Sequence, residues 1–222
     1  MNSRKPVIII LVALLAAAGS GYWMLQNSGQ NSPSSGSPTP ESAVPAATPT
    51  IELPPGTGRG VVVLEEFGDY QCPPCGNLHP TLTTIKKEYG DRLRFIFHHF
   101  PLRQIHANAQ AAAEAAVAAG SQNKFWEMHN LLYENQTAWS ESPDMQSVTS
   151  NFARSIGLDL NQFLADTRST RTASTIATDV EQGMRRGVDS TPTLFINGEK
   201  IPFESYDAAG LRREIDRRMA SN

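Results

Sequence analysis

Apolar and polar positions divide the chain into three parts. An uninterrupted apolar run extends from Val7 to Ala18, and further apolar and aromatic residues follow as far as Leu25. Residues 26–58 are dominated by Ser, Pro, Thr and Gly, with too few apolar residues to bury a core. From residue 59 to Asn222, apolar residues recur with the periods of strands and helices, over a length that suits one domain. We therefore expect an N-terminal apolar segment (1–25), a disordered linker (26–58) and one folded domain (59–222).

The first part of the folded domain has the pattern of a βαβ unit. The apolar, β-branched stretch Val61 to Phe67 predicts a buried strand. A helix is expected directly after Cys72, which can act as its N-cap, with Pro73 at the first position and Gly90 at its end. Residues 92–100 alternate like a second strand. Strand, helix and strand within about 40 residues predict two parallel strands joined by a right-handed crossover.

Residues from about 101 to 188 have helical signals throughout. A compact domain rarely holds so long a loop without its own secondary structure, which predicts a helical insertion between strands. Ser142 is the expected N-cap of one of its helices, and Ile176, Val180 and Met184 recur four residues apart in the last. The segments predicted to be helical are 106–120, 124–136, 142–157, 158–167 and 169–187.

The β pattern returns near the C-terminus. Residues 193–196 predict a strand, Asn197-Gly198 a tight hairpin turn, and residues 200–203 the returning strand. The amphipathic stretch 205–220 predicts a closing helix. The expected order is therefore βαβ, then the helices, then ββα.

The apolar N-terminal segment has the features of an export signal. Arg4 and Lys5 precede the apolar run, whose 19 residues to Leu25 are about the length that crosses a bilayer. One interpretation is cleavage after the small residues that end at Ala18, which would release a soluble protein. The other is an uncleaved anchor with Tyr22 and its neighbour Trp23 at the membrane interface, and we favour it for its apolar length. Both predict that the domain lies outside the cytoplasm, on the periplasmic side.

Charge and cysteine content exclude two other classes of protein. Without Arg4 and Lys5 the chain has 17 basic and 22 acidic residues, which argues against a nucleic-acid partner. Two cysteines are too few for a small disulfide-stabilised scaffold. Cys72 and Cys75 are therefore expected to serve chemistry.

Cys72 and Cys75 are separated only by Pro73-Pro74, and such a pair has three plausible interpretations. A zinc site needs four ligands, so histidines would have to supply two, although neighbours in a strand, as at positions 98 and 99, point to opposite faces. A structural disulfide closing so small a loop would remove little unfolded-chain entropy. A redox dithiol is favoured, because the start of a helix after a strand stabilises a thiolate. The histidines considered for zinc are His79, His98, His99, His106 and His129.

Four segments then occur in a recognisable order. They are FGDYQCPPC (67–75), FPLRQIHANAQAAAEAA (100–116), KFWEMHNLLYENQ (124–136) and GVDSTPTLFINGEK (187–200). With them the chain resembles the thioredoxin fold and, within it, the DsbA-like exported oxidoreductases, whose helical insertion lies between the βαβ and ββα halves. The resemblance extends from Val61 to the C-terminus.

The resemblance implies roles for particular residues. Cys72 would be the exposed nucleophile and Cys75 the buried resolving thiol. Thr191-Pro192 would face the disulfide with a cis peptide and present backbone groups to an extended substrate; the alternative is an ordinary trans proline starting an edge strand. Glu66 would be a buried acid that relays the proton of Cys75, and Glu65 would then be exposed. Strand alternation alone does not choose between the two glutamates.

Other candidates are expected to have structural roles. His79 could lie near the cysteine pair, but an exposed helix position is the favoured interpretation. We expect His106 and His129 to pack or cap, and Phe125 and Trp126 to belong to the core.

The prolines between the cysteines bear on the pKa of the nucleophile. Pro73 and Pro74 have no N–H, so the amides left to stabilise a Cys72 thiolate are those of Cys75 and Gly76. The expected pKa of Cys72 therefore lies between about 3.5 and about 7, the values for DsbA and thioredoxin. A stabilised thiolate favours the reduced form and makes the disulfide oxidising.

The expected function is thiol–disulfide exchange on exported proteins, most readily as an oxidant, with no cofactor beyond the dithiol. Expected partners are exported proteins with cysteines and a membrane redox protein that recycles the dithiol. The lack of an obvious dimerisation segment indicates a monomer. The alternatives are a reductase or isomerase with the same residues, a non-catalytic client-binding module, and a metallochaperone.

Overall fold

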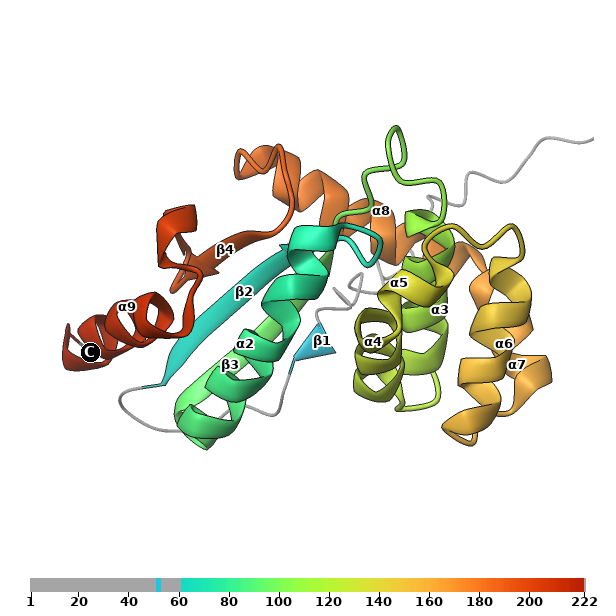
Figure 1. The fold of residues 1–222 in the computed structure, drawn as a ribbon, viewed down its shortest axis with the longest axis horizontal. Coiled ribbons are helices and arrows are strands. Elements are labelled where there is room, and N and C mark those ends of the chain that lie inside the picture. The colour runs from blue at the N-terminus through green and yellow to red at the C-terminus, as the bar shows by residue number, and fades with distance from the viewer. Residues whose placement is uncertain (1–50, 53–60, 222) are drawn as a thin grey trace, which may run out of the picture. The chain divides into compact units, whose positions relative to one another are not determined.

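A computed structural model describes residues 51–52 and 61–221 (Figure 1). The predicted N-terminal apolar segment (1–25), and the predicted linker (26–58) except for two residues, lie outside the described residues. Within the described part, no helix combines the length and the apolar composition needed to span a bilayer.

A five-stranded sheet in the order β1-β3-β2-β4-β5 forms the centre of the domain. The central strand β2 pairs in parallel with β3 and antiparallel with β4. The predicted βαβ unit and the returning ββα half are therefore both confirmed. The edge strand β1 pairs antiparallel with β3 and was not predicted, because it occupies two residues of the expected linker. The strands are β1 (Ile51–Glu52), β2 (Val62–Gly68), β3 (Leu93–His99), β4 (Thr193–Ile196) and β5 (Glu199–Lys200).

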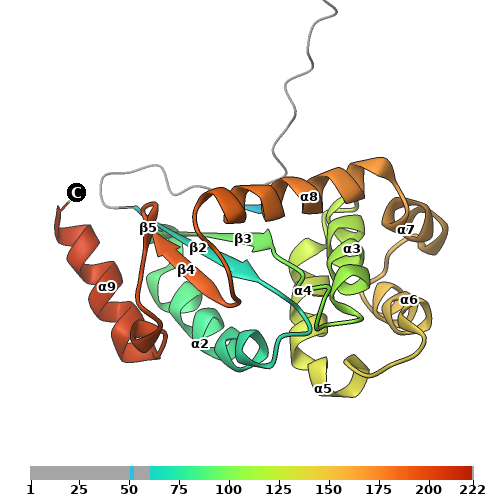
Figure 2. The same ribbon diagram turned by 90° about the horizontal axis from the view of Figure 1, so that it is seen from above.

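Helices cover both faces of this sheet. Figure 2 shows α2 (Pro73–Tyr89) and α9 (Ala208–Ser221) on one side and α8 (Thr170–Arg185) on the other. Nearly every side chain of β2 and β3 is buried as a result.

Helix α2 has the boundaries that its sequence predicts. Cys72 is the N-cap in an extended conformation, Pro73 occupies the first helical position, and Gly90 ends the helix with φ of 51°. Glycine reaches this positive φ without the strain that a Cβ atom would cause. The start of α2 is thus fixed at the first cysteine.

The helical insertion is confirmed and is arranged around α3, whose alanines lie in the core. Small side chains let the surrounding helices approach α3 closely. The helices begin one to three residues later than the predicted segments, and the segment predicted as 124–136 ends at Glu134, before a short separate helix that was not predicted. Helix α3 begins at Ala109 because His106 instead bonds Asp69. Asp144 rather than Ser142 caps α6, by accepting from the Ser147 amide at 2.9 Å. The helices of the insertion are α3 (Ala109–Gly120), α4 (Phe125–Glu134), α5 (Gln136–Trp139), α6 (Met145–Ser155), α7 (Leu160–Thr167) and α8.

The C-terminal hairpin is shorter than expected. Asn197 and Gly198 have φ of 50° and 83°, as the predicted tight turn requires. The returning strand β5 ends at Lys200 and does not continue to Phe203, which belongs to a 3₁₀ turn (Phe203–Ser205). Pro202 has no N–H with which to continue the ladder.

Candidate active site

The two cysteines lie at the start of α2, directly after the loop that leaves β2. Both carry free thiols. Cys75, in the first turn, is 0 % exposed, and Cys72 is 5 % exposed. Cys72 was expected to be exposed, but its thiol is largely covered, because Sγ donates to the carbonyl oxygen of Thr191 at 3.2 Å. Only Cys72 retains any access to solvent.

The environment of Cys72 favours its thiolate. A hydrogen bond from the Cys75 thiol, helped by the Thr191 side chain and the Cys75 amide, lowers the pKa of Cys72 to about 6 against the opposing effects of burial and Asp69. In the dithiol form the Thr191 hydroxyl is buried without a hydrogen-bond partner, so it is free to donate to the thiolate. The Gly76 amide was expected to stabilise the Cys72 thiolate, but it donates to the Cys72 backbone carbonyl at 3.2 Å.

Cys75 and Glu66 hold their protons more tightly than usual. Burial, followed by the hydrogen bond to Cys72 and the nearby charge of Glu66, raises the pKa of Cys75. Burial also raises the pKa of Glu66 to about 8, although Lys86 opposes this effect. One carboxyl oxygen of Glu66 has no hydrogen-bond partner within the described residues. Glu66 is therefore a buried acid that is protonated near neutral pH.

The expectation that Glu65 is exposed was wrong. Glu65 is 9 % exposed and bonds both terminal nitrogens of Arg186, at 2.7 and 2.9 Å. His98 lies 3.1 Å from the same carboxylate. Burial alone would raise its pKa, but the hydrogen bonds from His98 and Arg186 lower the pKa of Glu65 to about 2. Glu65 thus faces α8 as one half of a buried ion pair. Near neutral pH, Glu65 is negatively charged and its neighbour Glu66 is neutral.

Thr191 lies against the dithiol, as the resemblance implied, and Pro192 follows it. Their peptide bond is cis, and both side chains are buried. The loop is held in place by the Thr193 hydroxyl, which donates to the Ser190 carbonyl at 2.8 Å. The structure therefore brings Thr191 to Cys72 from the far end of the chain.

Asp69 organises the loop before the cysteines, and no pattern in the sequence predicted this role. Its buried carboxylate accepts hydrogen bonds from the amides of Gln71 at 2.8 Å and Leu102 at 2.9 Å. His106 Nδ1 lies 2.7 Å from the same carboxylate, in keeping with a capping role. Asp69 thus joins the cysteine loop to the loop that follows β3.

Gln136 is a second residue that the sequence did not single out. Its amide nitrogen donates to the carbonyl oxygens of Tyr70 at 2.7 Å and Cys72 at 2.9 Å. A Cβ atom on Gly76 would lie 2.5 Å from the Gln136 amide oxygen, so a larger residue there would push Gln136 away from these two carbonyls. Gln136 lies in the family-like segment 124–136, but nothing in its spacing from the cysteines predicts the contact.

Aromatic and histidine side chains pack behind the dithiol. His79 was expected to be exposed, but α4 covers this side of α2 and buries it against Tyr133, with ring centroids 5.1 Å apart. Burial lowers the pKa of His79 to about 4. His129 packs as predicted, with Nδ1 3.1 Å from the Tyr70 hydroxyl. Phe125 is in the core, and within the described residues no three metal-ligating side chains are grouped to hold a metal ion.

A sheet of βαβ and ββα halves, a helical insertion between them and a dithiol that opens the first helix define a thioredoxin-like domain of the DsbA type. The chain belongs to the thioredoxin family, whose model, described as thioredoxin, matches residues 56–217. Trp126 was expected in the core. It is partly buried and packs against the core cluster.

Solved structures share this architecture. A thioredoxin-like oxidoreductase from Silicibacter pomeroyi DSS-3 is 24 % identical, with a TM-score of 0.63, over 76 % of this chain and 91 % of that one. Oxidised BdbD from Bacillus subtilis is 22 % identical, with a TM-score of 0.66, over 77 % of this chain and 93 % of that one. At these identities the likeness establishes the fold.

A curated relative is longer. The Na(+)/H(+) antiporter NhaA 1 of Salinispora arenicola (strain CNS-205) is 36 % identical over 145 residues, which are 65 % of this chain and 21 % of the antiporter. This chain therefore spans about a fifth of that relative's length, and the match gives no reason to assign ion transport to it.

Proposed function

We propose that this chain is a protein thiol–disulfide oxidoreductase that introduces disulfides into exported proteins through Cys72 and Cys75. The observation that carries the proposal is the asymmetry of the pair. The pKa of Cys72 is lowered to about 6, whereas that of the buried Cys75 is raised. Such a pair has one accessible sulfur that is a stable thiolate and one that stays protonated.

The reaction begins with the Cys72–Cys75 disulfide. A substrate thiolate attacks Sγ of Cys72, the S–S bond breaks, and its electron pair leaves on Sγ of Cys75. The pKa of Cys75 is high, so its thiolate needs a proton, and the protonated carboxyl of Glu66 is the proposed source. A second substrate thiolate then attacks the substrate sulfur of the mixed disulfide. Cys72 leaves as a stabilised thiolate, the substrate is oxidised, and no cofactor is needed beyond the dithiol.

Substrate is proposed to lie beside the Thr191-Pro192 loop. The Thr191 carbonyl accepts from the Cys72 thiol, so in the disulfide form it loses this donor and can accept from a substrate amide. Next to it, a groove of about 500 Å³ is lined by Pro192, Ile201 and the exposed Phe203, among others. An extended, apolar stretch of an unfolded protein fits this surface.

The export of the domain is part of the same proposal. Basic residues before an apolar run support an N-terminal export signal or anchor. Outside the cytoplasm, disulfides persist, and a membrane redox partner would return the dithiol to the disulfide.

The test of the activity is oxidative refolding of reduced, unfolded ribonuclease A by the oxidised protein. We expect ribonuclease activity to return in proportion to the disulfide added, because a stabilised Cys72 thiolate drives electrons toward this protein. The matched control is Cys72→Ser, which should give only the rate of air oxidation. Failure to refold ribonuclease, together with rapid reduction of insulin by the dithiol form, would contradict the proposal and identify a reductase.

A further inference from the structure

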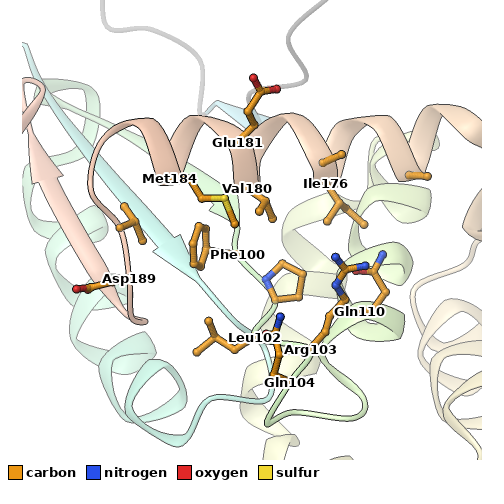
Figure 3. A pocket seen from close by; sticks show the side chains of 14 residues that line it. Phe100, Leu102, Arg103, Gln104, Gln110, Ile176, Val180, Glu181, Met184 and Asp189 are labelled. Atoms are coloured by element: carbon orange, nitrogen blue, oxygen red, sulfur yellow. The ribbon is translucent and has the colours of Figure 1, made fainter.

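A second cavity, of about 500 Å³, lies between the loop after β3 and helix α8, which lines it from Ala173 to Met184. Figure 3 shows Phe100 and Val180 pointing into it, with Met184 reaching over it from α8. Its lining is mainly apolar, with a few polar groups at the rim, as is typical of ligand-binding sites of this volume. It is distinct from the groove beside Phe203, because the Val188 to Pro192 loop lies between the two.

Both walls of this cavity are tied to the dithiol. Leu102, in one wall, donates its amide to Asp69, which also holds the cysteine loop. Asp189, in the other wall, stands two residues before Thr191, the contact of Cys72. Two extended residues span at most about 7 Å. A chain bonded to Cys72 therefore reaches the cavity within a few residues.

The apolar stripe of α8 leaves the core at this cavity. Ile176 is buried against α3, Val180 is half-buried, and Met184 is 65 % exposed. Ile105, on the loop that forms the opposite wall, is also exposed. Single exposed apolar side chains are common, but Met184 borders a cavity beside a nucleophile. This arrangement offers burial to an apolar side chain from outside.

The polar groups at the rim of the cavity differ between its two ends. In Figure 3, Arg103 and Gln110 lie at one end and Asp189 at the other. Within the described residues Arg103 is exposed and takes part in no ion pair, whereas Glu181 pairs with Arg185. An occupant with a negative charge at the end far from Thr191 would complement the unpaired guanidinium.

We infer that this cavity binds the client polypeptide at a point two to four residues from its reacting cysteine. It would accept a large apolar side chain, and an acidic residue beyond that side chain would meet Arg103. The client segment is extended. The amide nitrogen of Gln110 donates to Glu114 at 2.9 Å, and its amide oxygen can accept from the client backbone. This inference rests on the proposed function and adds a sequence preference to it.

The test uses ten-residue peptides with one cysteine, in which leucine or serine stands two, three or four residues to either side. The rate of mixed-disulfide formation with the oxidised full chain is measured for each peptide. At one or more of these positions we expect leucine to react about tenfold faster, since burying a leucine side chain provides at least this factor. With the wild-type protein, a peptide that has Lys instead of Asp beyond the leucine should form the mixed disulfide more slowly.

Variants distinguish this cavity from general stickiness. Val180→Glu places a carboxylate among the apolar residues and should remove the preference for leucine. Thr178→Glu is the matched control, because Thr178 is exposed on the same helix and does not line the cavity, so the preference should remain. Arg103→Glu is a surface change that should not disturb folding, and it should reverse the preference between the Asp and Lys peptides.

Equal rates for leucine and serine peptides at every position, with the peptides reacting, would overturn the inference and leave the proposed function standing. A preference that survives Val180→Glu would overturn it as well. Absence of reaction with any peptide would overturn both proposals. A wild-type dimer that Val180→Glu dissociates would assign the cavity to a second copy and overturn the client assignment.

Discussion

Cys72→Ser should abolish thiol–disulfide exchange, whereas Cys75→Ser should accumulate mixed disulfides. In Cys75→Ser the Cys72 thiolate can still attack a substrate disulfide and displace one substrate thiolate, and no Cys75 thiol is present to resolve the product. Cys72 is the sulfur with access to solvent, and its pKa of about 6 leaves about half of it as thiolate at pH 6. Cys75 is buried, and its pKa lies above 9, so less than about one part in a thousand is thiolate at that pH. Iodoacetamide at pH 6 should therefore modify Cys72 at least about 100-fold faster, as peptide mass spectrometry would measure.

The same variants test where the protein acts. In cells, the proteins trapped by Cys75→Ser should be exported ones, and Cys72→Ser should trap none. Equal alkylation of the two cysteines would remove the division of roles between them. Trapping of cytoplasmic proteins alone would contradict the export of the domain.

Glu66→Gln should stabilise the protein at alkaline pH. The pKa of Glu66 is about 8 in the folded state and 4.5 when unperturbed. Because the folded-state pKa is raised, the stability linked to this group is fully present below pH 4.5 and is lost as pH rises toward 8. The difference corresponds to a loss on the order of 5 kcal/mol above pH 8. Urea unfolding at pH 5 and pH 8.5 should show that Glu66→Gln removes most of this loss.

Glu65→Gln is the matched control, since the same substitution at the neighbouring residue should change the free energy of unfolding in the opposite direction. The pKa of Glu65 is lowered to about 2, so its stability is present above pH 4.5 and is lost only as pH falls toward 2. Removing this carboxylate leaves Arg186 without its buried partner and should cost about 3 kcal/mol at neutral pH. If Glu66→Gln proved as destabilising as Glu65→Gln at pH 8.5, Glu66 would not be the neutral buried acid.

Local signals predicted most of the fold. The cap at Cys72, the proline after it and Gly90 act within a few residues of α2, and the Asn197-Gly198 turn does the same for its hairpin. The errors arose where two local candidates competed or where a strand lay at an edge. Asp144 displaced Ser142 as a cap, because its carboxylate reaches the Ser147 amide.

The site was predictable only in part. The cysteine pair is visible in the sequence, and the resemblance supplied the cis peptide of Thr191-Pro192, but burial on both faces of the sheet was not foreseen. Glu65 and His79 were expected to be exposed, but each is buried by a part of the insertion that is distant in sequence. Packing over such distances leaves no local pattern in the sequence. Gln136 reaches the cysteine loop across more than sixty residues, for the same reason unpredicted.

The central claim is that a stabilised Cys72 thiolate makes the dithiol form the more stable one, and hence the disulfide oxidising. Equilibrium urea unfolding of the reduced and oxidised proteins from pH 5 to pH 8 tests it most directly. Because the folded pKa of Cys72 is about 6 and the unperturbed value is 9, its ionisation adds stability to the reduced form as pH rises above 6. At pH 7 this contribution is about 1 kcal/mol, and it grows with pH. We expect the reduced form to be the more stable, by a margin that widens from pH 6 to pH 8; an oxidised form that is more stable across this range would contradict the account.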